Sequence, residues 1–285
     1  MNRADQKMQE YLAKNPFLQE TAAVQQGVAQ AIRNAVSPME FPVQEEIKKR
    51  TQEGLPLLQN EALQEKIGGA AAESLPQALT ELLAVAVPEP LAEALQTFAK
   101  WAGRQTGVKM RELIRLVITQ NDEKLNVLLQ AEGLQGTVVR AVIWQMVDAL
   151  VPANLKHYEF WQELGWTRNY CPVCGRQPIM AHLRKEKEGR ARFLVCDGCH
   201  TEWPFARVGC AYCGNEDLTK MHILEPEGQS AIRLDVCDKC HAYLKTYNEE
   251  GEEGIYLQDW ATLHFDLLGE EQNLIKKGSV LLESK

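Results

Sequence analysis

Apolar residues recur at helical spacing through most of residues 1–165. In the stretch that begins at Leu57, for example, Leu63 and Ile67 return to the same face of a helix. We therefore expect an all-helical N-terminal domain whose apolar faces pack in its core. The expected helices are Met1–Leu12, Phe17–Val36, Leu57–Ile67, a helix that includes Leu79, a helix that begins at Pro88, Lys109–Thr119, Asp122–Ala131, Leu134–Leu150 and Pro152–Leu164.

Proline, glycine and capping residues indicate where several of these helices begin and end. Pro38 suits an early helical position, where its missing backbone N–H removes no hydrogen bond. Gly68 and Gly69 predict the end of one helix. Ser74 and Gln77 resemble a capping box, which predicts that the next helix begins there.

Between residues 166 and 248 the pattern changes to short strands separated by polar turns. Each pair of strands is typical of a β-hairpin, because the turns are rich in charged residues, glycine or proline. The expected hairpins are Ile179–Arg184 with Arg192–Val195 around the turn Lys185–Arg190, and Leu218–Leu224 with Ala231–Val236 around the turn Glu225–Ser230.

All eight cysteines lie in this region, as four Cys-x-x-Cys pairs. A Cys-x-x-Cys turn directs two thiolates toward one cation at about 2.3 Å, and two such turns complete a four-sulfur site. We therefore expect two metal sites with four cysteine ligands each. Such closed sites leave no coordination position for water, so they suit a structural role with zinc or electron transfer with iron. The expected metal ligands are Cys171, Cys174, Cys196, Cys199, Cys210, Cys213, Cys237 and Cys240.

The cysteine region is also an internal duplication. Arg192–His200 aligns with Arg233–His241, and Cys171–Gly175 aligns with Cys210–Gly214. Each half then has the order of a zinc ribbon, a cysteine turn followed by a hairpin and a second cysteine turn. We expect the first pair to join the second and the third to join the fourth. A crossed pairing stays open, because the second and third pairs are close in the sequence.

The remaining residues begin with an acidic, glycine-containing run, Glu249–Gly254, which indicates a linker. Tyr256–Gly269 has helical spacing and is expected to form a C-terminal helix that docks on the rest of the protein. The fold class is therefore expected to be α+β. The expected domains are 1–165 (helical), 166–207 (first four-cysteine metal module), 208–248 (second four-cysteine metal module) and 249–285 (acidic linker and C-terminal helix).

Composition and charge narrow the functional classes. The 285 residues contain no long apolar segment, and the N-terminus is polar, so we expect a cytoplasmic protein without membrane insertion. Paired cysteines in that compartment favour metal sites over the alternative of disulfides. Residues 166–248 hold 12 Lys/Arg and 10 Asp/Glu, a net charge of +2, and each four-thiolate site would keep about −2 with a divalent cation. That balance disfavours nucleic-acid binding.

Two histidines and three aromatic residues adjoin the cysteines. His200 and His241 directly follow the last cysteine of their modules, and we expect them to support the sites or to lie at the surface rather than bind metal. We expect Trp203, Phe205 and Tyr212 to pack between the two modules.

Several segments of the region resemble the E-type accessory family of formate dehydrogenases. Thr201–Trp203 and Tyr243–Lys245 are the specific parts of the resemblance, because generic zinc ribbons lack them. The segments that resemble the family are Trp166–Gly175, Arg192–Trp203, Val208–Asn215, Val236–Lys245 and, for the C-terminal helix, Asp259–Leu268.

The resemblance implies a helical N-terminal domain followed by two rubredoxin-like or zinc-ribbon modules, with the eight cysteines as metal ligands. It implies a non-catalytic accessory protein that binds the catalytic subunit of a formate dehydrogenase in the cytoplasm and supports its maturation. The resemblance favours iron, but the ligand set suits zinc equally well. Two other functions stay open on the residues alone: a nucleic-acid-binding zinc-ribbon protein and a rubredoxin-like electron carrier.

Overall fold

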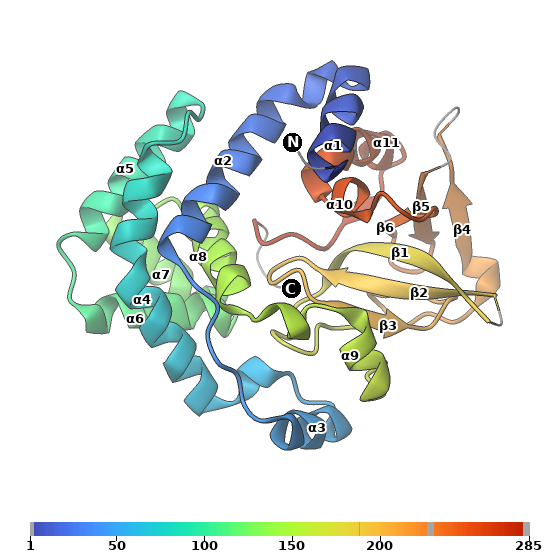
Figure 1. Cartoon of the computed structure of the whole chain (residues 1–285), viewed down its shortest axis with the longest axis horizontal. Coiled ribbons are helices and arrows are strands. Elements are labelled where there is room, and N and C mark those ends of the chain that lie inside the picture. The colour runs from blue at the N-terminus through green and yellow to red at the C-terminus, as the bar shows by residue number, and fades with distance from the viewer. Residues whose placement is uncertain (1–2, 188, 227–230, 282–285) are drawn as a thin grey trace.

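The computed structural model describes residues 3–187, 189–226 and 231–281, in which a helical part precedes a β-sheet (Figure 1). This order confirms the α+β class. Among the described residues, no helix combines the length and the apolar content needed to cross a membrane. The helices before the sheet are α1 (Arg3–Lys14), α2 (Gln19–Ala35), α3 (Gln44–Glu53), α4 (Glu61–Leu83), α5 (Glu89–Ala102), α6 (Gly107–Ile118), α7 (Asp122–Glu132), α8 (Gly136–Leu150) and α9 (Tyr158–Glu163).

Helix α4 is longer than the sequence pattern predicts. It begins after Asn60, whose side chain accepts a hydrogen bond from the Leu63 N–H, and it continues through Gly68, Gly69 and Pro76. The predicted stop at Gly68 and the predicted capping box at Ser74 are therefore wrong. Each glycine costs about 1 kcal/mol and an internal proline about 3 kcal/mol. Burial outweighs this cost, because α4 packs against α2, α5, α6 and α8 and each buried Leu or Ile contributes about 1.5–3 kcal/mol.

Two other helix boundaries differ from the prediction. The chain does not enter a helix at Pro38, because the Met39 N–H donates to the Leu150 carbonyl at the end of α8, and α3 begins only at Gln44. The predicted helix Pro152–Leu164 is divided into a short 3-10 turn and the short helix α9. At the first of these boundaries a long-range hydrogen bond outweighs the local preference of proline.

Both predicted hairpins are present in the described residues. Among the predicted strand residues, Leu218–Lys220 form a 3-10 turn instead, and Ala231 lies just before its strand. Residue 188 of the first predicted turn and residues 227–230 of the second lie outside the described residues. The strands are β1 (Pro178–Glu186), β2 (Gly189–Cys196), β3 (Glu202–Phe205), β4 (Met221–Leu224), β5 (Ile232–Cys237), β6 (Ala242–Tyr247) and β7 (Ile275–Lys276).

The two hairpins join edge to edge in one sheet, with strand order β3-β2-β1-β6-β5-β4. The join is a parallel pairing of β1 with β6, in which Met180 lies opposite Lys245 and His182 lies opposite Tyr247. Strand β7, which the sequence did not indicate, pairs with the remaining part of β6. The two cysteine modules are thus halves of one sheet, and the predicted domain boundaries stay predictions.

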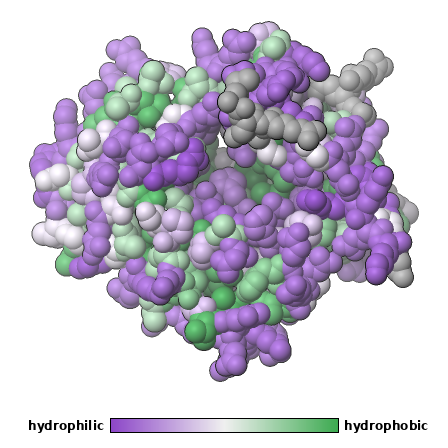
Figure 2. Space-filling model, in the orientation of Figure 1, coloured by the Kyte–Doolittle hydropathy of each residue, from purple (hydrophilic) through white to green (hydrophobic). Residues whose placement is uncertain are grey.

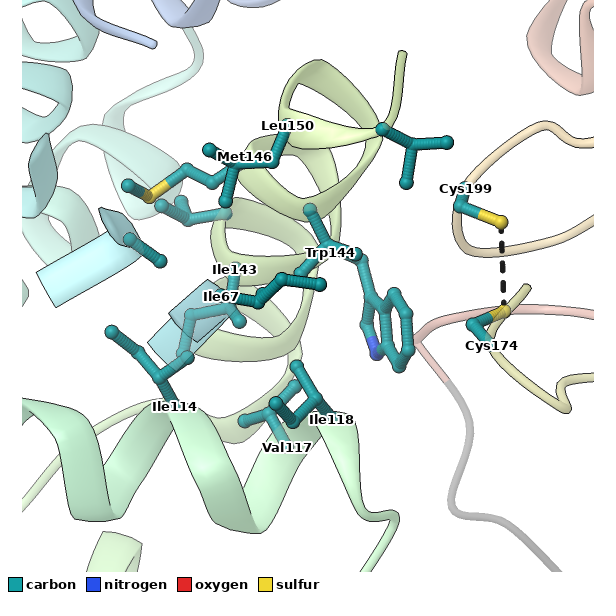
Figure 3. Close-up of a cluster of buried hydrophobic side chains, with 14 of the residues drawn as sticks. Ile67, Ile114, Val117, Ile118, Ile143, Trp144, Met146, Leu150, Cys174 and Cys199 are labelled. Carbon is teal, nitrogen blue, oxygen red and sulfur yellow. Dashed lines mark hydrogen bonds between the residues drawn. The ribbon is translucent and has the colours of Figure 1, made fainter. Parts of the chain in front are cut away.

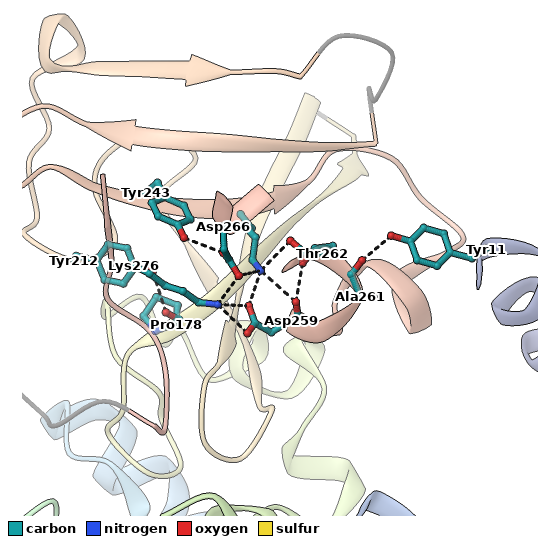
Figure 4. A network of polar contacts seen from close by, with 10 residues as sticks. Tyr11, Pro178, Tyr212, Tyr243, Asp259, Ala261, Thr262, Asp266 and Lys276 are labelled. Carbon is teal, nitrogen blue, oxygen red and sulfur yellow. Dashed lines mark hydrogen bonds and ion pairs between the residues drawn. The ribbon is translucent and has the colours of Figure 1, made fainter. Parts of the chain in front are cut away.

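The C-terminal segment is divided where one helix was predicted. Helix α10 (Glu253–Tyr256) and a 3-10 turn (Asp259–Thr262) precede α11 (Leu263–Glu271). The buried Lys245 of β6 explains the division, because its Nζ donates to the carbonyls of Asp259 and Thr262 and lies 3.0 Å from Asp266 Oδ2. Lys276 contacts Asp259 and Asp266 as well (Figure 4). Two lysines and two aspartates therefore fasten this segment to the sheet.

The core has two parts. The larger cluster joins the helices to the first cysteine module and contains Trp144, Trp161, Trp203 and Cys171. Trp203 therefore packs with the helical part rather than between the modules. The smaller cluster joins the second hairpin to the C-terminal segment, where Phe265 is buried. The outer surface seen in Figure 2 is mainly hydrophilic, with smaller hydrophobic areas between the charged side chains.

Candidate metal centres

The cysteine turns have matching local geometry in the two halves of the sheet. In the first turn, the Gly175 N–H donates to the Cys171 carbonyl, with Gly175 at φ +78°. The corresponding turn has the same bond from Gly214 to Cys210, with Gly214 at φ +68°. Glycine adopts this left-handed conformation without a steric penalty, so the turn can close directly after the second cysteine of each pair.

The structure brings the eight cysteines together in two groups. Each group has four Sγ atoms within 4.8 Å of one another, and the pairing is sequential. In the first group, Cys174 Sγ lies 3.3 Å from Cys196 Sγ and 3.6 Å from Cys199 Sγ. A crossed pairing is thereby excluded. The groups are Cys171, Cys174, Cys196 and Cys199, and Cys210, Cys213, Cys237 and Cys240.

These separations fit a shared cation and not a disulfide. Four sulfurs at about 2.3 Å from a tetrahedral ion stand about 3.8 Å apart, whereas a disulfide bond is about 2.05 Å long. In the second group, Cys210 Sγ and Cys240 Sγ are 3.6 Å apart, and Cys213 Sγ and Cys237 Sγ are 3.7 Å apart. Both groups therefore approach the spacing of a four-thiolate site.

The chemistry of the donor set also fits a soft divalent cation. Burial raises the pKa of the Cys171, Cys174 and Cys196 thiols well above their ordinary value, and a divalent cation bound among them would offset the cost of ionising them. Backbone N–H groups point at some of the sulfurs, as from Gly198 to Cys196 Sγ at 3.3 Å. Such donors stabilise thiolates. Zinc and iron both suit this donor set.

A buried ion pair supports the first group. Arg176, which follows the first cysteine turn, donates from Nε and an Nη to the two carboxylate oxygens of Asp197, both at 2.7 Å. Asp197 lies between Cys196 and Cys199, so the pair ties the two turns of the site together. Burial raises the pKa of Asp197, although the Arg176 charge opposes that shift.

The helical part encloses the same group. Trp144 of α8 extends toward Cys174 and Cys199 (Figure 3), and the Arg176 guanidinium lies 4.9 Å from the centre of its ring. The backbone of the first turn also accepts hydrogen bonds from the helical part, from Leu57 N–H to Pro172 and from Leu58 N–H to Val173. The first group is thus a joint between the helices and the sheet.

The second group lies in a different environment. Cys213 is exposed and Cys240 is partly exposed. Asp238, the counterpart of Asp197, forms a surface pair with His222 at 3.1 Å instead of a buried pair with an arginine. The two halves are connected by the buried Arg192, which donates to the Gly209 carbonyl at 2.8 Å just before the third cysteine pair.

The histidines next to the cysteines lie outside both groups. His200 Nδ1 is 3.2 Å from Asp148 Oδ1 of α8, so it contacts the helical part, and His241 is exposed. Both adopt positive φ, 51° and 53°, in the last cysteine turn of their modules.

Sequence reasoning missed the surroundings of the first group. The duplication aligned Asp197 with Asp238, but nothing in the pattern distinguished a buried aspartate from an exposed one. Gly198 was a usable signal, because its counterpart is Lys239 and a side chain at Gly198 has no space beside Trp144.

The fold and the two cysteine groups define a class of protein: paired four-cysteine modules, joined in one sheet and mounted on a helical part. Comparison with known proteins shows which family this region is similar to. Residues 170–207 match the model described as "FdhE, central domain", and residues 208–282 match "FdhE, C-terminal domain". The resemblance to the E-type formate dehydrogenase accessory family is therefore confirmed over residues 170–282.

Individual relatives agree. The chain is 33% identical to the "Protein FdhE homolog" of Aquifex aeolicus (strain VF5) over 114 residues, which is 39% of this chain and 40% of that protein. It is 33% identical to the "Protein FdhE" of Escherichia coli O1:K1 over 136 residues, 46% of this chain and 41% of that protein. The matches thus span less than half of these relatives.

The fold comparison extends further along the chain. The crystal structure of the FdhE protein from Pseudomonas aeruginosa matches with a TM-score of 0.59 at 18% identity, over 90% of this chain and 85% of that chain. At that identity the likeness shows a shared fold, and it includes the helical part.

Proposed function

We propose that this chain is an accessory factor that binds the catalytic subunit of a formate dehydrogenase in the cytoplasm and supports its maturation to the active form. The observation that carries the proposal is the match of residues 170–282 to the FdhE central and C-terminal domains, with all eight cysteines inside the matched range. The role is non-catalytic: the chain holds and presents a surface to another protein.

The proposal includes two resident metal ions, zinc or iron, one for each four-cysteine group. Support comes from the Sγ separations, which are near those of a four-thiolate site. In the described part of the chain, these two are the groups of His, Cys, Asp or Glu side chains whose ligand atoms lie close enough together to hold a metal ion. When bound, the ion supplies structural cohesion and, if it is iron, a one-electron centre. Cys171, Cys174, Cys196 and Cys199 would hold the first ion, and Cys210, Cys213, Cys237 and Cys240 the second.

The metal at the first group has a mechanical role in this proposal. The group lies where the helical part meets the sheet, with Trp144 on one side and the Arg176–Asp197 pair on the other. An ion there fixes the relative position of the two parts, and so shapes any surface that both contribute to. The partner would then recognise the assembled chain and not a single module.

Capture of the catalytic subunit tests the proposal. The full chain, purified without oxygen and immobilised, should retain the formate dehydrogenase catalytic subunit from a lysate of the same organism. A double variant, Cys196→Ser with Cys199→Ser, should lose that capture and should fail to restore formate dehydrogenase activity in cells that lack the chain. If the wild-type chain captures no subunit, the partner assignment is wrong.

A matched control separates metal loss from general damage. Lys109→Ala removes an exposed ion pair with Glu132 on the helical part and should leave capture and metal content unchanged. Normal capture and activation by the double cysteine variant would refute the role given to the metal while leaving the partner assignment in place.

An electron-carrier function is the second candidate, because the exposed Cys213 brings the second group to the surface where electrons can enter or leave. It requires iron. The protein as isolated should then be reddish and should bleach reversibly on reduction, whereas a colourless zinc protein contradicts it. A salt-dependent shift of DNA or RNA by the chain would instead favour the nucleic-acid alternative.

A further inference from the structure

The two cysteine groups differ in their access to solvent. In the first group the four residues are 0–4% exposed. In the second group Cys210 and Cys237 are buried, but Cys213 is exposed and Cys240 is partly exposed. The two halves of the duplication differ at Gly198, whose counterpart is Lys239, and at Arg176, whose counterpart is Asn215, so different groups pack against each half.

Three separate segments cover the first group. Trp144 of α8 lies against the second cysteine turn, so closely that a Cβ on Gly198 would be 2.8 Å from the indole ring. The turn before α4 holds the first cysteine turn through the Leu57 and Leu58 N–H groups. The C-terminal segment adds the Ser279 carbonyl, which accepts from Arg176 at 3.1 Å. A chelator can reach these sulfurs only after the helices and the sheet separate.

The second group lacks a cover of this kind among the described residues. The side chains next to it in the fourth cysteine pair are at the surface: Asp238 and its partner His222 are 48% and 45% exposed. Its sulfurs do receive backbone donors, from the N–H groups of Tyr212 and Cys213 to Cys210 Sγ. Thiolates are therefore stabilised there without being enclosed.

We propose that the two sites have different tasks: the second group is an exchangeable site for a thiophilic divalent cation, and the first group holds its ion permanently as the joint of the fold. The proposal rests on the metal centres of the proposed function and divides their roles. An incoming soft ligand, such as a thiolate or a pyridyl chelator, would bind the ion of the second site as the exposed Cys213 or Cys240 thiolate leaves it. Loss of that ion leaves the helical part and the first hairpin assembled.

The two sites should release their ions at different rates because they differ in how much of the structure must open to free a coordination position. At the second site, rotation of one exposed thiolate away from the ion opens a coordination position without disturbing a core. At the first site, the same movement requires local unfolding of a buried cluster that includes Trp144 and Trp203. Since local openings span a wide range of free energies, the two release rates should differ at least about tenfold.

Zinc release from the full-length protein tests the proposal. The chain is loaded with two equivalents of zinc and mixed with excess 4-(2-pyridylazo)resorcinol, and the coloured chelate is followed with time. One equivalent should appear quickly and the other at least about tenfold more slowly. Iodoacetamide added after the fast phase, followed by peptide mass spectrometry, should label Cys213 and Cys240 while Cys171 and Cys199 stay unlabelled.

Two variants assign the phases. Cys213→Ser should remove the fast equivalent and keep the slow one. Trp144→Leu should speed the slow phase severalfold and leave the fast phase unchanged. Release of both ions at one rate, or labelling of Cys171 and Cys199 first, would overturn the division of tasks, although both ions would still be bound as the proposed function requires. A chain that takes up no zinc or iron contradicts the metal centres themselves.

Discussion

The Arg176 guanidinium lies between the Trp144 ring, 4.9 Å from its centre, and the Asp197 carboxylate, to which it makes two 2.7 Å hydrogen bonds. Trp144 belongs to helix α8, whereas Asp197 lies between two cysteines of the sheet. One side chain therefore links the helical part to the first metal centre. The second half of the duplication has no such link, because Asn215 occupies the position of Arg176.

Replacing Asp197 by alanine should destabilise the protein strongly. The substitution leaves the Arg176 charge buried without its partner, and breaking a buried pair in this way costs about 3–5 kcal/mol. Denaturant unfolding of the metal-loaded protein measures the change. The matched control is Asp238→Ala, the equivalent position in the second half, which is exposed and should change stability by no more than about 0.5 kcal/mol. Equal losses in the two variants would contradict the asymmetry of the sites.

Gly198→Ala should also be destabilising, although alanine is the smallest change available. A Cβ at this position would lie 2.8 Å from Arg176 Cδ and 2.8 Å from Trp144 Cε3, and neither group can move freely. Overpacking of this kind costs about 1–3 kcal/mol. Thermal unfolding checks the effect. Lys239→Ala, at the corresponding position of the exposed site, is the control and should leave the melting temperature nearly unchanged.

The ion network of the C-terminal segment should make stability depend on pH. Although burial favours the neutral acid, the charges of Lys245 and Lys276 lower the pKa of Asp259. A carboxylate with a depressed folded pKa stabilises the fold fully above its unfolded pKa of about 3.9, and the contribution is lost as pH falls through the folded value. The free energy of unfolding of the wild-type protein should therefore exceed that of the Asp259→Asn variant by about 1–3 kcal/mol at neutral pH.

That difference should narrow progressively below about pH 4, because Asp259 takes up a proton first in the unfolded chain and, at lower pH, in the folded protein. Denaturant unfolding at a series of pH values measures it. Acid also releases the metals, but it does so in both proteins, so the comparison isolates Asp259. A difference between wild type and variant that is the same at pH 3 and pH 7 would show that the network does not titrate as described.

His241 provides a test of the ligand set. It adopts φ +53°, a conformation that favours glycine, and it lies outside the second cysteine group. His241→Gly should keep two ions per chain and leave stability equal or slightly higher, whereas the β-branched His241→Val should lose about 1–2 kcal/mol through backbone strain. Elemental analysis measures the number of ions per chain, and thermal unfolding measures the stability of each variant. Loss of one ion in the glycine variant would mean that the imidazole binds metal.

Local sequence features determined the hairpins, the cysteine turns and most helices. A Cys-x-x-Cys spacing, a polar turn or an apolar stripe acts over a few residues. The local structure that it produces can therefore be predicted without the rest of the chain. The duplication added the sequential pairing, because each half repeats the same order of turn, hairpin and turn. On that basis the eight cysteines, as two sets of four, were expected from the sequence and are gathered by the structure.

Only the tertiary structure decided how these parts meet. Helix α4 continues through Gly68 and Pro76 because four neighbouring helices bury it. The two hairpins form one sheet through the parallel pairing of β1 with β6, in which Met180 lies opposite Lys245. The same is true of the unequal exposure of the two cysteine groups. Their sequences are nearly equivalent, but Trp144 and the Arg176–Asp197 pair enclose one group, and burial depends on neighbours that lie far away along the chain.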